Sequence, residues 1–262
     1  MGQSKDRLWS ALHQAARQRG VSLDRVEEAA VATRTLVALC GEQSTSRQMQ
    51  FRIGVALLSG NVHIVAPVCP DYTHENGKYT FRGVGGGTSL LAQLQIRFLR
   101  NIVQQLTACR VTLIVADHEA DDGALCVALG KSQDEFRSLI QESVQATRDA
   151  VKNFGWGAEA MTDVIPSLVA EEREEAEAIR TDHALLSRVM TDTICRSNMY
   201  AKIGRFTGEE MVERTIRTAA QYRVMGRFAA RNNLLVSNHS TVNLSWYREA
   251  GAAVLHNPVS VY

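Results

Sequence analysis

The stretch that decides the fold runs from Val62 to Asp122. It begins with VHIVAPVCPDY (62–72), continues through a polar loop to FRGVGGGTSLLAQLQIRFLRNIVQQL (81–106), and ends with RVTLIVADHEADD (110–122). This is an apolar strand, a glycine-rich loop, an amphipathic helix and a second apolar strand that ends in acidic residues. The order is typical of a βαβ unit with a parallel sheet, so it predicts an α/β fold.

Both predicted strands end in polar residues. In open α/β sheets, a ligand binds just beyond the carboxyl ends of the strands. The first strand is followed by Cys69, Pro70, Asp71 and Tyr72, and the second by the segment Asp117–Asp122. The sequence therefore predicts that the chemistry takes place at this edge of the sheet.

Length and composition are those of a soluble globular protein. The 262 residues suffice for one large α/β domain or two small ones, with a substantial core. Hydrophobic residues make up 45% and charged residues 22%, which are ordinary values. Because the net charge is only +1, any nucleic-acid site must be a local patch.

The five cysteines are scattered along the chain. They form no CxxC pair and no Cys/His cluster, so neither a zinc site nor a disulfide framework is indicated. We expect no bound metal and no cofactor. Their isolated spacing favours reduced thiols in the cytoplasm. The N-terminus lacks the apolar core of a signal peptide, and no apolar run approaches the roughly 20 residues that span a bilayer. We therefore expect a cytoplasmic protein without a membrane partner.

Helices and short strands are predicted around the βαβ unit. Two helices are expected between residues 5 and 46, with Asp24 as N-cap of the second, and Phe51–Leu58 is ambiguous between helix and strand. We assign residues 1–48 to an α-helical N-terminal extension. Residues 49–262 are assigned to a Rossmann-like catalytic domain, a parallel sheet of about five strands flanked by helices.

Later elements follow from the same patterns. They are a helix from Ser132 to Asn153 with a Ser132–Glu135 capping box, a strand over Ala158–Val164, a charged helix over Val169–Met190, a long helix over Glu209–Arg231, and strands over Leu234–Val236 and Ala252–Val261.

The glycine run GVGGGTS (83–89) opens the helix of the βαβ unit. Glycines let backbone N–H groups approach an anion, and a helix N-terminus adds about half a positive charge. The spacing fits neither GxGxxG nor the P-loop. The alternative is a flexible turn in which Thr88 or Ser89 caps the helix. The candidate substrate-binding residues here are Gly85, Gly86, Gly87, Thr88 and Ser89.

The segment VADHEADD (115–122) places four carboxylates within six residues at a strand end. Such clusters can hold a divalent metal or an ammonium group, and Asp117-His118-Glu119 approximates the DxD of some glycosyltransferases. The alternative is a solvated loop before the next helix. Asp117 and Glu119 are the candidates for ligand contact.

Cys69 lies at the mouth of the first strand. A thiol nucleophile needs a base, and His74 and His118 qualify only if the fold brings them close. The commoner fate of a lone cysteine at a strand end is burial as a small hydrophobic residue. Asp71 and Tyr72 face the crevice if the strand before them is buried.

The helix predicted over Glu209–Arg231 carries several arginines beside Tyr222. Arg223, Arg227 and Arg231 are four residues apart and share one face. Such a stripe can track phosphates. The equally weighted alternative is ion pairing with the acidic helix around residues 171–177.

Three segments resemble the cyclodipeptide synthases. They are VADHEADDGALCVALGKSQDEF (115–136), RTAAQYRVMGRF (217–228) and AVLHNPVSVY (253–262). Enzymes of this family have a Rossmann domain similar to class I aminoacyl-tRNA synthetases. They hold an aminoacyl group from tRNA on a serine after the first strand and form a diketopiperazine with a second one. The resemblance implies an aminoacyl-tRNA partner and a catalytic role for Tyr222.

Two positions depart from the pattern of this family. Its catalytic tyrosine is followed four residues later by glutamate, whereas Tyr222 is followed by Gly226. Its serine motif after the first strand is replaced by VCPDY (68–72), so the candidates for the nucleophile are Cys69, Thr73 and Ser89.

A second family is similar in outline. The segments LLVSNHSTVNL (234–244) and VLHNPV (254–259) resemble the isocyanide synthases, which join an amino acid to a pentose phosphate carbon. The first segment contains His239, a candidate substrate-binding residue.

We therefore expect an aminoacyl-tRNA-dependent transferase that makes a cyclodipeptide-like or other small amino-acid-derived product. The alternatives are an isocyanide synthase-like or nucleotide-sugar-type transferase for a phosphate-bearing substrate, and a non-enzymatic module that senses a metabolite. The candidate catalytic residues are Cys69, Asp71, Tyr72, Asp117, Glu119 and Tyr222. The candidate substrate-binding residues are Gly85, Gly86, Gly87, Thr88, Ser89, Arg223, Arg227 and His239.

Overall fold

A five-stranded, entirely parallel sheet lies at the centre of the computed structural model, which describes residues 2–40, 46–70, 72–75, 78–81, 86–123, 126–127, 130–203, 206–238 and 241–257. Its strands are β1 (Val62–Val68), β4 (Cys109–Val115), β5 (Gly157–Ala160), β6 (Leu235–Asn238) and β7 (Ala253–His256). A separate antiparallel hairpin consists of β2 (Tyr72–Glu75) and β3 (Lys78–Phe81). The predicted α/β, Rossmann-like class is confirmed.

The order of the strands is β5-β4-β1-β6-β7. From β1 the chain winds outward through β4 to β5, and it then returns to the other side of β1 for β6 and β7. The winding direction therefore reverses between β1 and β6. In sheets of this kind, ligands bind beyond the carboxyl ends of the strands at that switch point.

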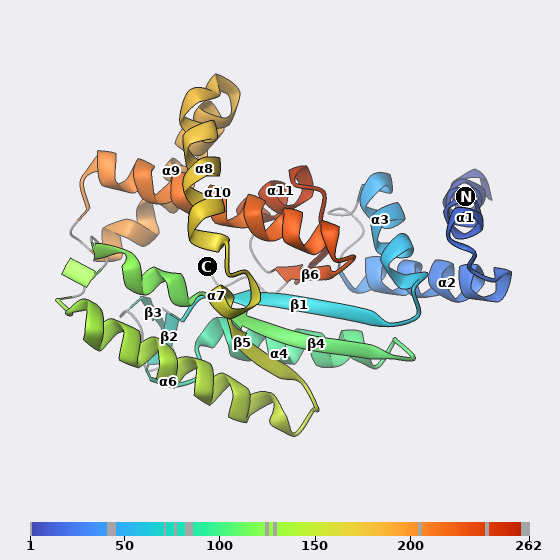
Figure 1. Cartoon of the computed structure of the whole chain (residues 1–262), viewed down its shortest axis with the longest axis horizontal. Coiled ribbons are helices and arrows are strands. Elements are labelled where there is room, and N and C mark those ends of the chain that lie inside the picture. Colours follow the sequence, from blue (N-terminus) through green and yellow to red (C-terminus); the bar gives the residue numbers. More distant parts are fainter. Residues whose placement is uncertain are drawn as a thin grey trace.

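Helices cover both faces of the sheet (Figure 1). The helices α4 and α6 lie on one face, and α10 and α11 lie on the other. The bounds of the helical elements are α1 Gly2–Arg19, α2 Leu23–Leu39, α3 Arg47–Leu57, α4 Leu90–Val103, η2 Asp117–Asp121, α6 Gln133–Lys152, α7 Met161–Val164, α8 Leu168–Thr181, α9 His183–Ile203, α10 Gly208–Arg231 and α11 Thr241–Glu249. Within the described ranges, no helix combines the length and the apolar character needed to cross a membrane.

The N-terminal helices share the core of the sheet. Leu12 of α1, Leu36 of α2 and Ile53 of α3 are fully buried in the same hydrophobic cluster as Ile64 of β1. The segment Phe51–Leu58, ambiguous from sequence, forms most of α3 and its C-cap.

Capping side chains set several of the boundaries. The predicted capping box of Ser132 and Glu135 is confirmed at the start of α6, and Ser89 caps α4 by accepting a 3.2 Å hydrogen bond from the Ala92 amide. The predicted N-cap at Asp24 is wrong. Ser22 is the N-cap of α2, and Asp24 lies in the first turn, where a carboxylate favours the positive end of the helix dipole.

Two predicted elements are interrupted. The strand expected over Ala158–Val164 ends at Ala160, and Met161–Val164 turns into α7. The helix expected over Val169–Met190 is broken at Asp182, whose Oδ1 accepts hydrogen bonds of 2.8 and 3.1 Å from the next helix. Asp182 therefore starts α9 as an N-terminal cap.

The C-terminal part adds one helix that the patterns did not predict. This is α11, which connects β6 to β7 on the same face as α10. The expected last strand over Ala252–Val261 corresponds to β7, which ends at His256, and residues 258–262 lie outside the described part.

Candidate active site

The candidate active site lies at the switch point between β1 and β6. Cys69 follows β1 directly, and Asn238 is the last residue of the neighbouring strand β6. Cys69 is partly exposed and packs against Leu90 and Leu91 at the start of α4, whereas Asn238 is buried. The thiol is therefore held by apolar contacts at the crevice and is still reachable from solvent.

Tyr247 of α11 is the second polar group of the site. It is fully buried, and its ring centroid lies 5.0 Å from that of Tyr222 on α10. Burial raises the pKa of Tyr247 well above its usual value, the charge of an ionised Cys69 raises it further, and the Asn238 side chain opposes this. Tyr247 is therefore neutral at pH 7 and close enough to Cys69 and Asn238 for each to influence its hydroxyl.

The hydroxyl of Tyr247 lacks a hydrogen bond of normal geometry to any residue that the structure describes. An unpaired buried hydroxyl costs about 1–3 kcal/mol, so such groups need a specific explanation. A neutral tyrosine is a hydrogen-bond donor. Beside Cys69, it can stabilise negative charge that develops on sulfur or on a substrate oxygen.

A buried polar network fixes β6 next to this site. The Gln95 side chain of α4 donates to the Ser237 carbonyl at 3.3 Å, and the Ser237 hydroxyl donates back to Gln95 at 2.8 Å. The Asn257 amide donates to the Asn238 carbonyl at 2.8 Å. These residues are almost completely inaccessible to solvent, so the end of β6 is held rigidly between α4 and β7.

The pair of tyrosines depends on close approach of α10 and α11 at Gly226. A Cβ at this position would lie 2.8 Å from the Cβ of Ala250 and 3.0 Å from the Tyr247 carbonyl oxygen. Real Cβ atoms essentially never approach so closely. The glutamate that cyclodipeptide synthases carry four residues after their tyrosine therefore has no room here.

The described residues of the glycine run join α4 to α6. A Cβ at Gly86 would overlap the carboxylate of Glu142, and the Thr88 hydroxyl donates to the Ala146 carbonyl at 3.1 Å. By contrast, the space around Gly87 is open. Helix packing thus accounts for Gly86 and Thr88, and Ser89 acts as the predicted cap.

The acidic segment after β4 is largely engaged in the fold. Asp117 accepts hydrogen bonds from the Thr162 hydroxyl and, at 3.0 Å, from its amide, so it caps α7. Asp121 pairs with Arg137 at 2.8 Å, and Asp122 pairs with two arginines of α10. Among the residues described, no group of three or more His, Cys, Asp or Glu side chains is placed to hold a metal ion.

His118, considered as a base, is buried three residues beyond Val115, which pairs with Val68. Neither of its ring nitrogens has a hydrogen-bond partner within the described part of the chain. His118 therefore follows β4, the strand next to the one that Cys69 follows. Both of its ring nitrogens can still form hydrogen bonds.

The arginine stripe of α10 faces the acidic helix α8. Arg223 and Arg227 both bond Glu175, whose side chain is 10% exposed, and Arg217 bonds Glu172 at 3.1 Å. Burial raises the pKa of Glu175, but hydrogen bonds and charges from Arg223 and Arg227 outweigh it and lower the pKa overall. Ion pairing, the alternative to phosphate binding, is thus observed for these arginines.

Several sequence candidates are incompletely described. Asp71, Gly85 and His239 lie outside the described residues. Tyr72, Thr73 and His74 lie in β2 and Glu119 lies in η2, but their side chains are outside the described part.

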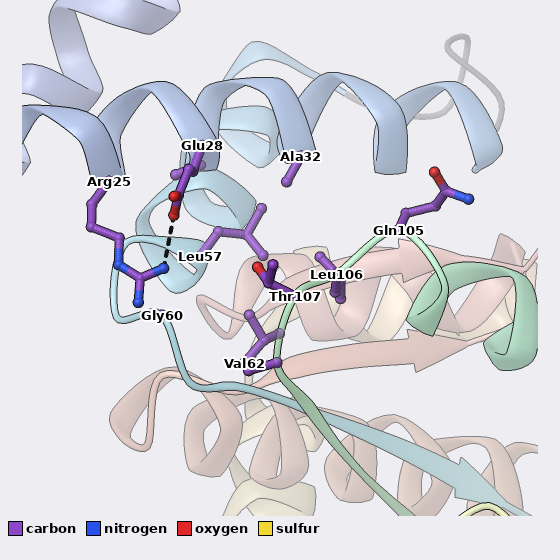
Figure 2. A pocket seen from close by; sticks show the side chains of 11 residues that line it. Arg25, Glu28, Ala32, Leu57, Gly60, Val62, Gln105, Leu106 and Thr107 are labelled. Carbon is purple, nitrogen blue, oxygen red and sulfur yellow. Dashed lines mark hydrogen bonds and ion pairs between the residues drawn. The ribbon is translucent and has the colours of Figure 1, made fainter.

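Figure 2 shows a small hollow at the opposite end of β1, between α2 and the loop before β4. Arg25 and Glu28 form a 2.8 Å ion pair beside it. Its volume is about 40 Å³, enough for a few water molecules and too small for a substrate.

No protein-family model matches the chain, and no curated protein matches its sequence. The chemistry of the site must therefore be inferred from the side chains themselves.

Sequence reasoning singled out Cys69 and Tyr222 but missed Tyr247 and Asn238. One signal was available. Two parallel strands near residues 234–236 and 252–261 require a crossover helix, and Tyr247 lies in the segment between them.

Proposed function

We propose that the protein is an aminoacyl-tRNA-dependent transferase that holds an aminoacyl group on the thiol of Cys69. The observation that carries this proposal is the partly exposed Cys69 beside the buried hydroxyl of Tyr247, which lacks a hydrogen bond of normal geometry to any described residue, at the switch point of a doubly wound sheet. Acyl transfer requires a nucleophile and a group that stabilises the developing negative charge. The two side chains supply these two functions.

In the first half-reaction, the Cys69 sulfur attacks the ester carbonyl of an aminoacyl-tRNA. An S–C bond forms, the C–O bond to the ribose breaks, and the thiol proton passes to the ribose oxygen. The amine of a second aminoacyl-tRNA then attacks the thioester, forming an amide while its proton returns to sulfur. The remaining amine then attacks the second ester, so that a C–N bond closes the ring, the C–O bond to the ribose breaks, and the amine proton passes to the ribose oxygen of the departing tRNA.

Burial disfavours the thiolate form of three of the other cysteines. It raises the pKa of Cys40 to about 12 and that of Cys109 to about 11, and it also raises the pKa of Cys126. Because the thiolate is the reacting form, little of each thiol can react at neutral pH. Cys195 is exposed on α9 and provides a matched control for Cys69.

The alternative of a nucleotide-sugar-type transferase for a phosphate-bearing substrate drew on the carboxylates after β4. Of these, Asp117, Asp121 and Asp122 are engaged by Thr162 and by arginines. A metabolite-sensing module is the non-enzymatic alternative, and turnover distinguishes it from a transferase.

The direct test is turnover of aminoacyl-tRNA. A tRNA pool charged with labelled amino acids is incubated with the wild type, Cys69→Ala and Cys195→Ala, and the loss of aminoacyl ester and the release of small labelled products are measured. We expect Cys69→Ala to lower turnover by roughly three orders of magnitude or more, because the nucleophile is removed. Cys195→Ala should be unchanged. Equal turnover in all three proteins, or none in the wild type, would refute the proposal.

Binding of tRNA provides an independent check. The affinity should fall steeply as salt rises, since each phosphate contact releases counterions. A sensor for an uncharged metabolite would show no such dependence.

A further inference from the structure

A larger hollow lies over the starting halves of β1, β4 and β5, on the face of the sheet that α10 covers. Its volume is about 200 Å³. A cavity of about 150 Å³ accepts benzene, and pockets for drug-sized ligands begin at about 300 Å³. The hollow therefore suits a molecule about as large as an amino acid. His63 in its wall precedes Cys69 by six residues, or about 20 Å along the strand, so this is a separate place.

Half of the ten residues that line the hollow are apolar, namely Val65, Ile114, Val164, Phe228 and Leu234, and the other half are His63, Arg110, Thr112, Glu159 and Asn232. The apolar residues come from β1, β4, α7, the end of α10 and the turn before β6. Such a surface accepts a hydrocarbon side chain and gives no reason to bind a fully polar ligand.

Two opposite charges complete the lining. Arg110 of β4 is exposed and Glu159 of β5 is half-buried, and neither has an ion-pair partner in the described ranges. Glu159 pairs in register with Ile114, four residues beyond Arg110, so the two backbone positions are about 13 Å apart along the strands. This separation leaves room for a ligand between the two charged groups.

The side chain of Glu159 leans towards Arg110. Its Oε1 lies 3.9 Å from the position that a Cβ would take on Gly157, which precedes it by two residues on the same face of β5. Because residue 157 is a glycine, no side chain separates the Glu159 carboxylate from Thr112, whose Oγ1 lies 3.5 Å from the same Cβ position. The carboxylate thus lies on the side of Glu159 that faces the starting end of the strands.

The polar group beside Arg110, on the neighbouring strand β1, is neutral. Nε2 of His63 lies 2.9 Å from Oγ1 of Thr112, and burial, followed by the charge of Arg110, lowers the pKa of His63. At pH 7 the hollow therefore presents one positive and one negative group.

We propose that this hollow binds a small zwitterion with an apolar side chain, an aliphatic α-amino acid, with its carboxylate on Arg110 and its ammonium group on Glu159. A ligand with a single charge would leave one of the two protein charges unpaired. A zwitterion satisfies both, while its side chain covers the apolar floor. This inference does not depend on the transferase activity.

The test is calorimetric titration of L-leucine at pH 7.5, beside 4-methylpentanoate, which lacks its amine, and 3-methylbutylamine, which lacks its carboxylate. We expect leucine to bind at least 10-fold more tightly than either analogue, because each analogue loses a charge-assisted hydrogen bond. Arg110→Gln and Glu159→Gln should each weaken leucine binding about 10-fold or more. Arg97→Gln and Glu174→Gln, exposed on α4 and α8, should bind like the wild type.

A second variant blocks the hollow without removing a charge. Gly157 has no positive φ, and a Cβ there meets Thr112 at an ordinary 3.5 Å, so Gly157→Val should fold and lose leucine binding. The proposal is overturned if leucine does not bind, if the three compounds bind equally, or if the charge variants and Gly157→Val retain full affinity. Binding that is lost only in Cys69→Ala would place leucine at the switch point and would also overturn it.

Discussion

The interface between α8 and α10 and the carboxyl edge of the sheet are both rich in polar side chains. The two regions differ in whether these side chains have ion-pair or hydrogen-bond partners. At the interface, Arg223 and Arg227 share Glu175. At the edge, the Tyr247 hydroxyl is buried without a hydrogen bond of normal geometry to any described residue. The pairing of this hydroxyl, rather than the density of polar residues, therefore distinguishes the edge of the sheet from the interface.

The largest loss of stability and of turnover is expected at Gly226, where α10 and α11 pack closely and place Tyr247 at the carboxyl edge of the sheet. Gly226→Leu should lower the free energy of unfolding by about 3 kcal/mol and abolish turnover, because a side chain there forces α11 and Tyr247 away from α10. Gly208→Ala, with open space around it, is the control and should change stability by less than about 0.5 kcal/mol. Urea unfolding measures both, and equal stabilities would show that the helices are not tightly packed.

Substitutions at the interface between α8 and α10 should lower the free energy of unfolding and leave turnover unchanged. Glu175→Gln leaves two arginines without their carboxylate and should cost about 1–2 kcal/mol at pH 7. Glu174→Gln, at an exposed position, should cost almost nothing.

The pH dependence of this loss follows from the lowered pKa of Glu175. A carboxylate with a lowered pKa stabilises the fold above its unfolded pKa of about 4.5, and this stabilisation is lost as the pH falls through the folded pKa. The difference between wild type and Glu175→Gln should therefore shrink below about pH 4. A difference that stays constant down to pH 3 would mean that the ion pairs do not form.

A substitution of Tyr247 at the carboxyl edge of the sheet should have the opposite effects, a gain in stability and a loss of turnover. Tyr247→Phe removes a buried hydroxyl without a normal hydrogen bond, so the free energy of unfolding should rise by about 1 kcal/mol while turnover falls at least 10-fold. Tyr222→Phe should also lower turnover, without the gain in stability. A Tyr247→Phe variant that is destabilised and fully active would make this hydroxyl a structural group.

The smallest change in the free energy of unfolding is expected for substitutions of Asp117. Asp117→Ala removes both hydrogen bonds that start α7 and should cost about 1 kcal/mol, whereas Asp117→Asn keeps an acceptor and should cost less. Thermal unfolding and turnover should be measured together. Loss of turnover in Asp117→Asn at unchanged stability would instead support direct ligand contact.

Local signals predicted much of the fold. The strands β1 and β4 are apolar runs, and α6 begins at a Ser–Glu capping box that is visible in the sequence. The end of β5 is not a local property. The turn that follows it is capped by Asp117, which lies 45 residues away from Thr162 in the chain.

The site was predictable only in part, for the same reason. Cys69 became a candidate because it follows an apolar strand, and Tyr222 because the segment around it resembles the helix that carries the tyrosine of the cyclodipeptide synthases. Tyr247 acquires its place from the strand order, which puts β6 beside β1 and packs α11 against α10 at Gly226. The sequence also could not show that Glu175 pairs with both Arg223 and Arg227, since that depends on how α8 and α10 pack.

The measurement that tests the role of Cys69 most directly is intact-mass spectrometry and peptide mapping of protein quenched in acid during turnover of aminoacyl-tRNA. We expect one aminoacyl group per chain on the peptide that contains Cys69, released by hydroxylamine as a thioester would be. It should be absent from Cys69→Ala and present in Cys195→Ala. An adduct on any other residue, or turnover by Cys69→Ala at the wild-type rate, would contradict the assignment of Cys69 as the nucleophile.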